Sequence, residues 1–101
     1  MLKSRTMLAL EIISILSKYD SIVTVAMIAK QTNRSTSLIE PIMSALSKGG
    51  MVVGFRGPGG GYKLAPMVKQ RTLRVLHRTM YPSDKVPASM IGRMRIWQVI
   101  P

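Results

Sequence analysis

The sequence predicts a single, mainly helical domain with a small β-hairpin, an α+β fold. A chain of 101 residues has room for one hydrophobic core. Apolar residues recur at the helical period in its first half, and the period falls towards two on both sides of a glycine-rich turn around Pro58. These features favour several short helices followed by two strands.

Two short helices are expected before Ser35. The first spans about residues 6–18, where one face holds Leu8, Ile12, Ile15, Leu16 and Tyr19. Thr24 is a candidate N-cap for the second helix, whose apolar residues are Val25, Ile28 and Ala29. Residues 31–34 are then predicted to form a turn.

A third helix is predicted to start at Ser37. Glu40 follows three positions later, the reciprocal spacing of a capping box, and the helix ends at Gly49 and Gly50. Its apolar residues are Leu38, Ile42, Ala45 and Leu46. Pro41 lacks an N–H and crowds the carbonyl of Ser37, so we expect an irregular first turn.

The hairpin strands are expected at residues 51–56 and 61–65, with the turn at Gly57, Pro58, Gly59 and Gly60. The order helix, helix, turn, helix, hairpin is that of a winged helix-turn-helix domain. In such a domain the third helix enters the DNA major groove, and the hairpin, or wing, reaches the flanking backbone or minor groove. We expect this domain to occupy residues 1–80.

The remaining residues are expected to join two copies of the chain. A short basic helix behind Thr72 completes the domain, and residues 81–87 are expected to be a linker. Residues 88–101 are predicted to form a short C-terminal helix for homodimerisation, with candidate contacts at Met90, Ile91, Met94, Trp97 and Ile100. The same side chains also suit the domain's own core or a ligand pocket.

The composition favours a polyanion partner and argues against an enzyme. Fifteen Lys and Arg against four Asp and Glu give a net charge of +11. One histidine, four scattered carboxylates and no cysteine leave little for acid–base, thiolate or metal chemistry, so no cofactor or metal is expected. His77 is expected at the surface, without a second metal ligand. No apolar run could span a bilayer, so we expect a cytoplasmic protein with no membrane partner.

The run Val-Gly-Phe-Arg-Gly-Pro-Gly-Gly-Gly-Tyr-Lys-Leu-Ala, residues 53–65, resembles the wing of a winged-helix transcriptional repressor family. This family includes the iron-sulfur regulator IscR, the nitric-oxide sensor NsrR and the cysteine-metabolism repressor CymR. Residues 24–29 resemble the family's second helix. Ser37-Leu38-Ile39-Glu40 stands where the family has Ser-Tyr-Leu-Glu at the start of its recognition helix. The resemblance covers about residues 1–80.

Three departures from the family pattern matter. Members that sense iron-sulfur clusters carry cysteines after the wing helix, whereas this chain has none, so no iron-sulfur cluster is expected. Only a short tail stands in place of the family's long dimerisation helix. Pro41 replaces a residue that is usually polar, next to the base-reading glutamate position that Glu40 occupies, which implies a different operator.

The sequence therefore predicts a regulator that binds double-stranded DNA sequence-specifically, a repressor occluding a pseudo-palindromic operator as a homodimer. A winged-helix module for RNA or a protein partner is the alternative. The candidate DNA contacts lie in the N-terminal arm, around the recognition helix and in the wing: Lys3, Arg5, Thr24, Arg34, Ser35, Thr36, Ser37, Leu38, Glu40, Arg56, Gly57, Pro58, Gly59, Gly60, Gly61, Tyr62 and Lys63.

Several of these residues also have a purely structural explanation. Residues 33–37 could be turn and cap residues only. Glu40 suits either a capping box or an acceptor for a cytosine amine. Lys3 and Arg5 could form a solvated basic end, although the resembled family lays this arm against the DNA backbone. The wing has more glycines than a turn needs, which favours close approach to DNA with Arg56 in a minor groove.

Overall fold

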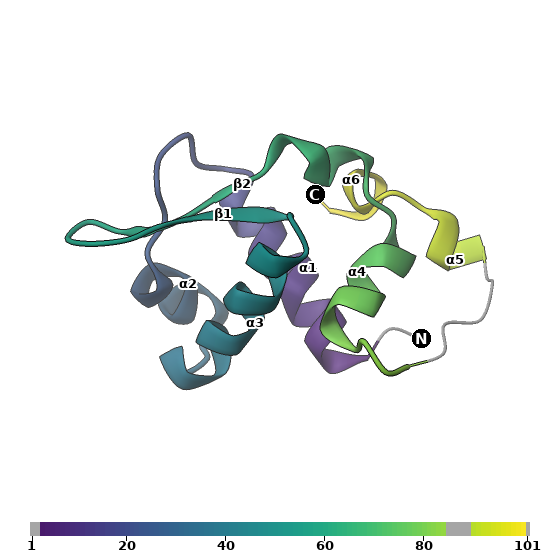
Figure 1. Ribbon diagram of the computed structural model, residues 1–101, viewed down its shortest axis with the longest axis horizontal. Helices are drawn as coiled ribbons and strands as arrows, with labels where there is room; N and C mark the ends of the chain where they lie inside the picture. The colour runs from purple at the N-terminus through teal and green to yellow at the C-terminus, as the bar shows by residue number, and fades with distance from the viewer. Residues whose placement is uncertain (1–2, 85–89, 101) are drawn as a thin grey trace.

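The computed structural model describes residues 3–84 and 90–100, in which the predicted fold class is confirmed. Three helices, α1 (Ser4–Leu16), α2 (Val25–Thr32) and α3 (Thr36–Lys48), precede the hairpin of β1 (Val52–Phe55) and β2 (Gly61–Leu64). A 3-10 helix, η1 (Pro66–Gln70), leads to α4 (Leu73–Met80), α5 (Met90–Arg93) and α6 (Ile96–Val99). Figure 1 shows the hairpin projecting from one end of the long axis, with α5 at the other. No helix in these residues is long and apolar enough to cross a membrane.

Helix α1 forms the centre of the hydrophobic core. It contacts α2, α3, α4 and β2, and it is therefore buried on more than the single face that the sequence predicts. Its buried residues are Thr6, Leu8, Ala9, Ile12, Ile13, Ser14, Ile15 and Leu16. The placement of Tyr19 on this face is wrong, because the helix ends before it. Tyr19 is 37% exposed, and its hydroxyl accepts a hydrogen bond from the Gln31 amide at 2.8 Å.

Helix α3 starts earlier than predicted, so the proposed capping box is wrong. Ser35 is the N-cap, and its Oγ accepts a hydrogen bond from the backbone N–H of Leu38 at 3.2 Å. Glu40 consequently lies in the second turn, too far along to bond back to the cap. Pro41 lies inside a helix without a break, and the carbonyl of Ser37 loses its helical partner there. The helix is stabilised by the burial of its apolar face, which consists of Ile39, Ile42, Met43 and Leu46.

The wing is anchored to the segment before α2. Strands β1 and β2 pair antiparallel, with Val52 opposite Leu64 and Phe55 opposite Gly61. The main chain of Tyr62 also exchanges two hydrogen bonds of 2.9 Å with Val23, which is buried. Since Thr24 caps α2 directly after Val23, the base of the wing has a fixed position relative to the helix-turn-helix.

The C-terminal tail differs from the single helix that the sequence predicts. It forms α5 and α6, which are separated by Met94 and Arg95. Leu73 N–H donates to Met94 O, and Ile96 N–H donates to Arg71 O, both at 2.9 Å. These main-chain groups bond across to the chain around Thr72 and not along a helix, and Ile96 is thereby fully buried in the core. Residues 85–89 of the predicted linker and tail, and Pro101, lie outside the described residues.

Candidate nucleic-acid interface

Helix α3 presents a polar face on the side opposite its buried residues. Thr36, Ser37 and Glu40 are exposed near its start, and Ser44, Ser47 and Lys48 continue the same face towards its end. Leu38 adds an apolar side chain that is 41% exposed. Without a capping box, the Glu40 carboxylate has no structural role at the helix start, and it is exposed on this face.

Two residues of the turn before α3, together with Thr24 before α2, have structural roles at the ends of these helices. Asn33 adopts the left-handed conformation, with a φ of 57°, and the next backbone N–H, of Arg34, donates to Ala29 O at 3.0 Å. The Oγ1 of Thr24 accepts the backbone N–H of Met27 at 3.1 Å. Thr24, Asn33 and Ser35 thus shape the helix ends, while the side chain of Arg34 is exposed beside them.

The glycines of the wing have a structural cause that the sequence argument missed. Gly57 and Gly59 have φ values of 91° and 75°, which favour glycine. A Cβ at Gly60 would collide with the carbonyl oxygen of Phe55, and one at Gly61 with that of Val23. The inference that the turn needs only one or two of them is therefore wrong. The turn requires Gly57, Gly59 and Gly60, and the contact of the wing with Val23 requires Gly61. Arg56, Pro58 and Lys63 are exposed, and Tyr62 is half-buried.

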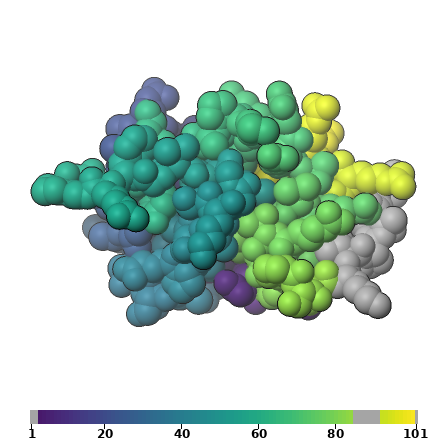
Figure 2. Space-filling view, viewed as in Figure 1, coloured from purple at the N-terminus to yellow at the C-terminus, as the bar shows by residue number. Residues whose placement is uncertain are grey.

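An open groove of about 610 Å³ runs between α3 and the wing. Ser44, Ser47 and Lys48 line one side, and the wing residues Arg56, Gly57 and Tyr62 line the other. Figure 2 shows the tip of the wing standing clear of the body beside this part of the molecule. The groove brings together the predicted wing residues and three α3 residues that the sequence analysis did not select. Their spacing from Ser37 and Glu40 along the exposed helix face is the signal that could have identified them.

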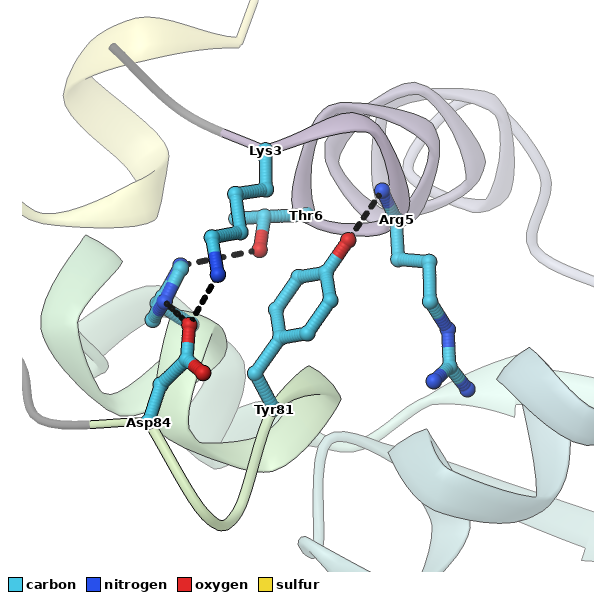
Figure 3. A network of polar contacts seen from close by, with 6 residues as sticks. Lys3, Arg5, Thr6, Tyr81 and Asp84 are labelled. Carbon is cyan, nitrogen blue, oxygen red and sulfur yellow. Dashed lines mark hydrogen bonds and ion pairs between the residues drawn. The ribbon is translucent and has the colours of Figure 1, made fainter.

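The N-terminal arm belongs to a separate polar cluster (Figure 3). Lys3 Nζ donates to the carboxylate of Asp84 at 2.5 Å, and the backbone N–H of Arg5 donates to the Tyr81 hydroxyl at 3.0 Å. The hydrogen bond with Asp84 raises the pKa of Lys3, and the same bond lowers the pKa of Asp84. Figure 3 shows the Arg5 side chain pointing away from this pair. The arm is thus held against the end of α4, and neither Lys3 nor Arg5 lines the groove.

His77 takes part in this cluster, contrary to its expected surface position. Its side chain is only 14% exposed. Its Nδ1 lies 3.3 Å from the hydroxyl of the buried Thr6, and its Nε2 lies 3.3 Å from Asp84. The cluster therefore links the first turn of α1 to the end of α4.

The predicted dimer contacts are divided between the surface and the core. Met90 and Ile91 lie in α5, and Met94 is 37% exposed. Trp97 and Ile100 are half-buried and pack against the core of their own chain, with Lys69 Nζ 5.6 Å from the centre of the Trp97 ring. The apolar face of the tail is therefore partly covered within one chain.

The second helix of the helix-turn-helix faces a wing across a groove lined by cationic and hydroxyl side chains. This arrangement defines a DNA-binding transcriptional regulator of the winged-helix class. The chain belongs to the Rrf2 family, described as iron-dependent transcriptional regulators, whose model matches residues 2–90. It is accordingly a transcription regulator and not an enzyme. A search of curated proteins gives no match.

Solved structures share the fold at low sequence identity. CymR, the global cysteine regulator of B. subtilis, is 22% identical with a TM-score of 0.69, over 89% of this chain and 72% of that one. IscR of T. potens is 18% identical with a TM-score of 0.74, over 96% of this chain and 83% of that one. CymR of Staphylococcus aureus, in its oxidized form, is 16% identical with a TM-score of 0.75, over 95% of this chain and 92% of that one.

The family description names iron, but the residues of this chain do not fit an iron or iron-sulfur centre. The sequence contains no cysteine, and no three His, Asp or Glu side chains come together within residues 3–84 and 90–100. Where His77 and Asp84 meet, the ammonium of Lys3 bonds to the same carboxylate oxygen and would repel a metal cation. We therefore derive no regulatory step through iron.

Proposed function

We propose that this protein is a sequence-specific repressor that binds double-stranded DNA as a homodimer and occludes a pseudo-palindromic operator. The groove between α3 and the wing is the observation that carries the proposal. In this proposal residues 35–40 enter the major groove and residues 56–62 reach the adjacent minor groove. Such a role places the protein in the cytoplasm, with the DNA.

The chemistry of the groove suits the sugar-phosphate backbone. A backbone strand separates the major from the minor groove, so a protein that enters both with neighbouring elements must accommodate that strand between them. Ser44 and Ser47 offer hydroxyl donors, and Lys48 and Arg56 offer positive charge on the two sides. At the helix start, Ser37 and Glu40 are exposed for contacts with base edges, where Glu40 would accept a cytosine amine.

A homodimer suits a regulator with one reading helix per chain. Two copies related by a twofold axis would present two α3 helices about one DNA turn apart, roughly 34 Å, and double the number of phosphates engaged. The exposed side chain of Met94, with Met90 and Ile91 in α5, is the proposed region of pairing.

Selection of bound sequences from a random duplex library, followed by gel shift, tests the proposal. We expect enrichment of a twofold-symmetric sequence that binds at least about a hundredfold more tightly than a scrambled duplex or RNA of the same sequence. Lys48→Ala should weaken binding, whereas Lys18→Ala, which removes an exposed cation in the turn after α1 that does not line the groove, should not. Equal binding to selected duplex, scrambled duplex and RNA would contradict sequence-specific repression.

A further inference from the structure

More than half of the net charge lies in the part of the chain that follows the proposed DNA-reading elements. Residues 66–101 contain seven Lys or Arg and one acid, Asp84, and so carry +6 of the total +11. Asp84 is already engaged by Lys3 and His77. A concentration of like charge destabilises the compact state unless an anion neutralises it.

Five of these cations gather on what we call the tail surface: Lys69, Arg71, Arg74, Arg93 and Arg95. The structure places them together through main-chain contacts. Thr72 and Arg95 form an antiparallel bridge, which brings Arg93 and Arg95 beside Arg71 and the first turn of α4. Lys69 reaches the ring of Trp97 in α6 from the preceding η1. Lys69, Arg93 and Arg95 are exposed, and the other two are half-buried.

Two of the five cations, Arg71 and Arg74, are partly withdrawn from the surface. In the described part of the chain, the Nε atoms of Arg71 and Arg74 and the Nη2 of Arg74 are buried without a hydrogen-bond partner. An anion that approaches from outside does not reach these buried atoms, so the exposed Lys69, Arg93 and Arg95 are the main groups available to it.

The tail surface lies away from the groove and the wing. The molecule measures 42 by 24 by 22 Å, and Figure 1 shows α5 at the end of the long axis opposite the wing, with η1 and α6 between the wing and α5. None of the five cations lines the groove between α3 and the wing. The tail surface is therefore a concentration of positive charge separate from the cations that line the groove.

We propose that the tail surface binds the phosphate backbone of a second DNA segment, so that the protein bridges two duplexes. This inference rests on the proposed function. In the proposed homodimer two tail surfaces would adjoin, because Met94 of the proposed pairing region lies between Arg93 and Arg95 in the chain. Their mutual repulsion favours a dense polyanion, and duplex DNA carries one charge per about 1.7 Å of its axis.

A capture experiment tests bridging. Protein is added to bead-bound duplex, and the capture of a second, labelled duplex that lacks the operator is measured. The wild-type chain should capture it in a salt-sensitive way. Arg93→Ala with Arg95→Ala should lower this capture at least about fivefold, since two phosphate contacts are lost. The same double variant should bind a single operator duplex within about twofold of wild type. Arg93→Lys with Arg95→Lys should retain capture, and Lys18→Ala with Lys30→Ala, which removes equal charge elsewhere, should also retain it.

Sedimentation of the same samples gives the oligomeric state. It thereby distinguishes bridging by the tail surface from bridging in which α3 and the wing of each protomer in a dimer bind a different duplex. Unchanged capture by the Arg93, Arg95 double alanine variant at unchanged oligomeric state would overturn the inference. Amide NMR shifts of residues 93–96 with a poly-glutamate peptide but not with a short duplex would overturn it in favour of an acidic protein partner. Loss of all duplex binding by the wild-type chain would contradict the proposed function itself.

Discussion

At the scale of single residues, Arg56 and Lys3 illustrate two different kinds of candidate DNA contact. Arg56 is exposed next to Gly57 in the wing and borders the groove opposite Lys48. Lys3 lies at the start of α1, where it is 54% exposed and paired with Asp84. A guanidinium in a minor groove senses groove width, whereas a lysine beside the backbone senses only phosphate.

We therefore predict different effects of removing the two charges. Arg56→Ala should weaken operator binding by about 1–3 kcal/mol and relax the base preference at the flanking positions. Lys3→Ala should weaken the binding of every duplex equally, whatever its sequence. The loss should be smaller than that from Arg56→Ala, because the ammonium of Lys3 is already bonded to Asp84. Gel shift on the operator and on a flank-randomised set measures both. Equal losses on every sequence from both variants would remove the role of the wing in sequence recognition.

At the scale of elements, α3 depends on one serine for its start and exposes another to its surroundings. The Oγ of Ser35 caps the helix by accepting from Leu38, whereas Ser37 is exposed within the first turn. Ser35→Ala should lower the free energy of unfolding by about 1 kcal/mol. Ser37→Ala should change it by less than about 0.5 kcal/mol but should weaken operator binding. Urea unfolding and gel shift on both variants provide the comparison. A larger stability loss from Ser37→Ala would restore the capping box that the structure replaces.

The contact between the arm and α4 should respond to pH. The Lys3 bond lowers the pKa of Asp84, so its stabilisation is present above the ordinary carboxyl value of about 3.9 and is lost as the pH falls through the lowered value. The same bond raises the pKa of Lys3, so at the alkaline end stabilisation persists below about 10.4 and is lost as the pH rises through the raised value.

Asp84→Asn should thus destabilise the chain at neutral pH and do so less at about pH 2, because the wild-type carboxylate loses its charge as the pH falls through its lowered pKa. Urea unfolding at the two pH values measures the difference. Asp20→Asn, at an exposed aspartate after α1, is the control and should change neither. A destabilisation of the same size at both pH values would show that the ion pair contributes nothing.

At the scale of the whole molecule, the net charge should dominate DNA affinity. Each phosphate contact releases counterions, so the logarithm of the binding constant should fall with the logarithm of salt concentration at a slope of about −5 or steeper for a dimer. Fluorescence anisotropy on the selected operator over a salt series measures this slope. A slope shallower than about −2 is incompatible with the proposed interface.

Assembly is the second property of the whole molecule. Variants in the tail distinguish side chains that stabilise the single chain from side chains that pair two chains. Trp97→Ala should lower the melting temperature, because the ring packs on its own core, and any loss of dimer should follow from this loss of stability. Met94→Ser, at a side chain that is 37% exposed, should shift sedimentation towards monomer with little change in melting temperature. A wild-type chain that sediments as a monomer at micromolar concentration, with half-site affinity equal to that for a full palindrome, would contradict the homodimer.

The sequence alone determined the class of fold and the order of its elements. Helical periodicity, the Thr24 and Thr72 caps and the glycine turn are local signals, because each depends on residues within a few positions of one another. The wing run was sufficiently distinctive to indicate the family that the match over residues 2–90 shows. The charge of +11 similarly indicated a polyanion partner.

Only the tertiary structure decided which side chains meet. Ser44, Ser47 and Lys48 become part of the groove because Val23 fixes the wing beside α3. Asp84 finds Lys3 across 81 residues of sequence, and the tail breaks at Met94 because it bonds to the chain around Thr72. The physical reason is the same in each case. Local spacing fixes which face of an element a residue occupies, whereas its partner depends on how the elements pack around α1.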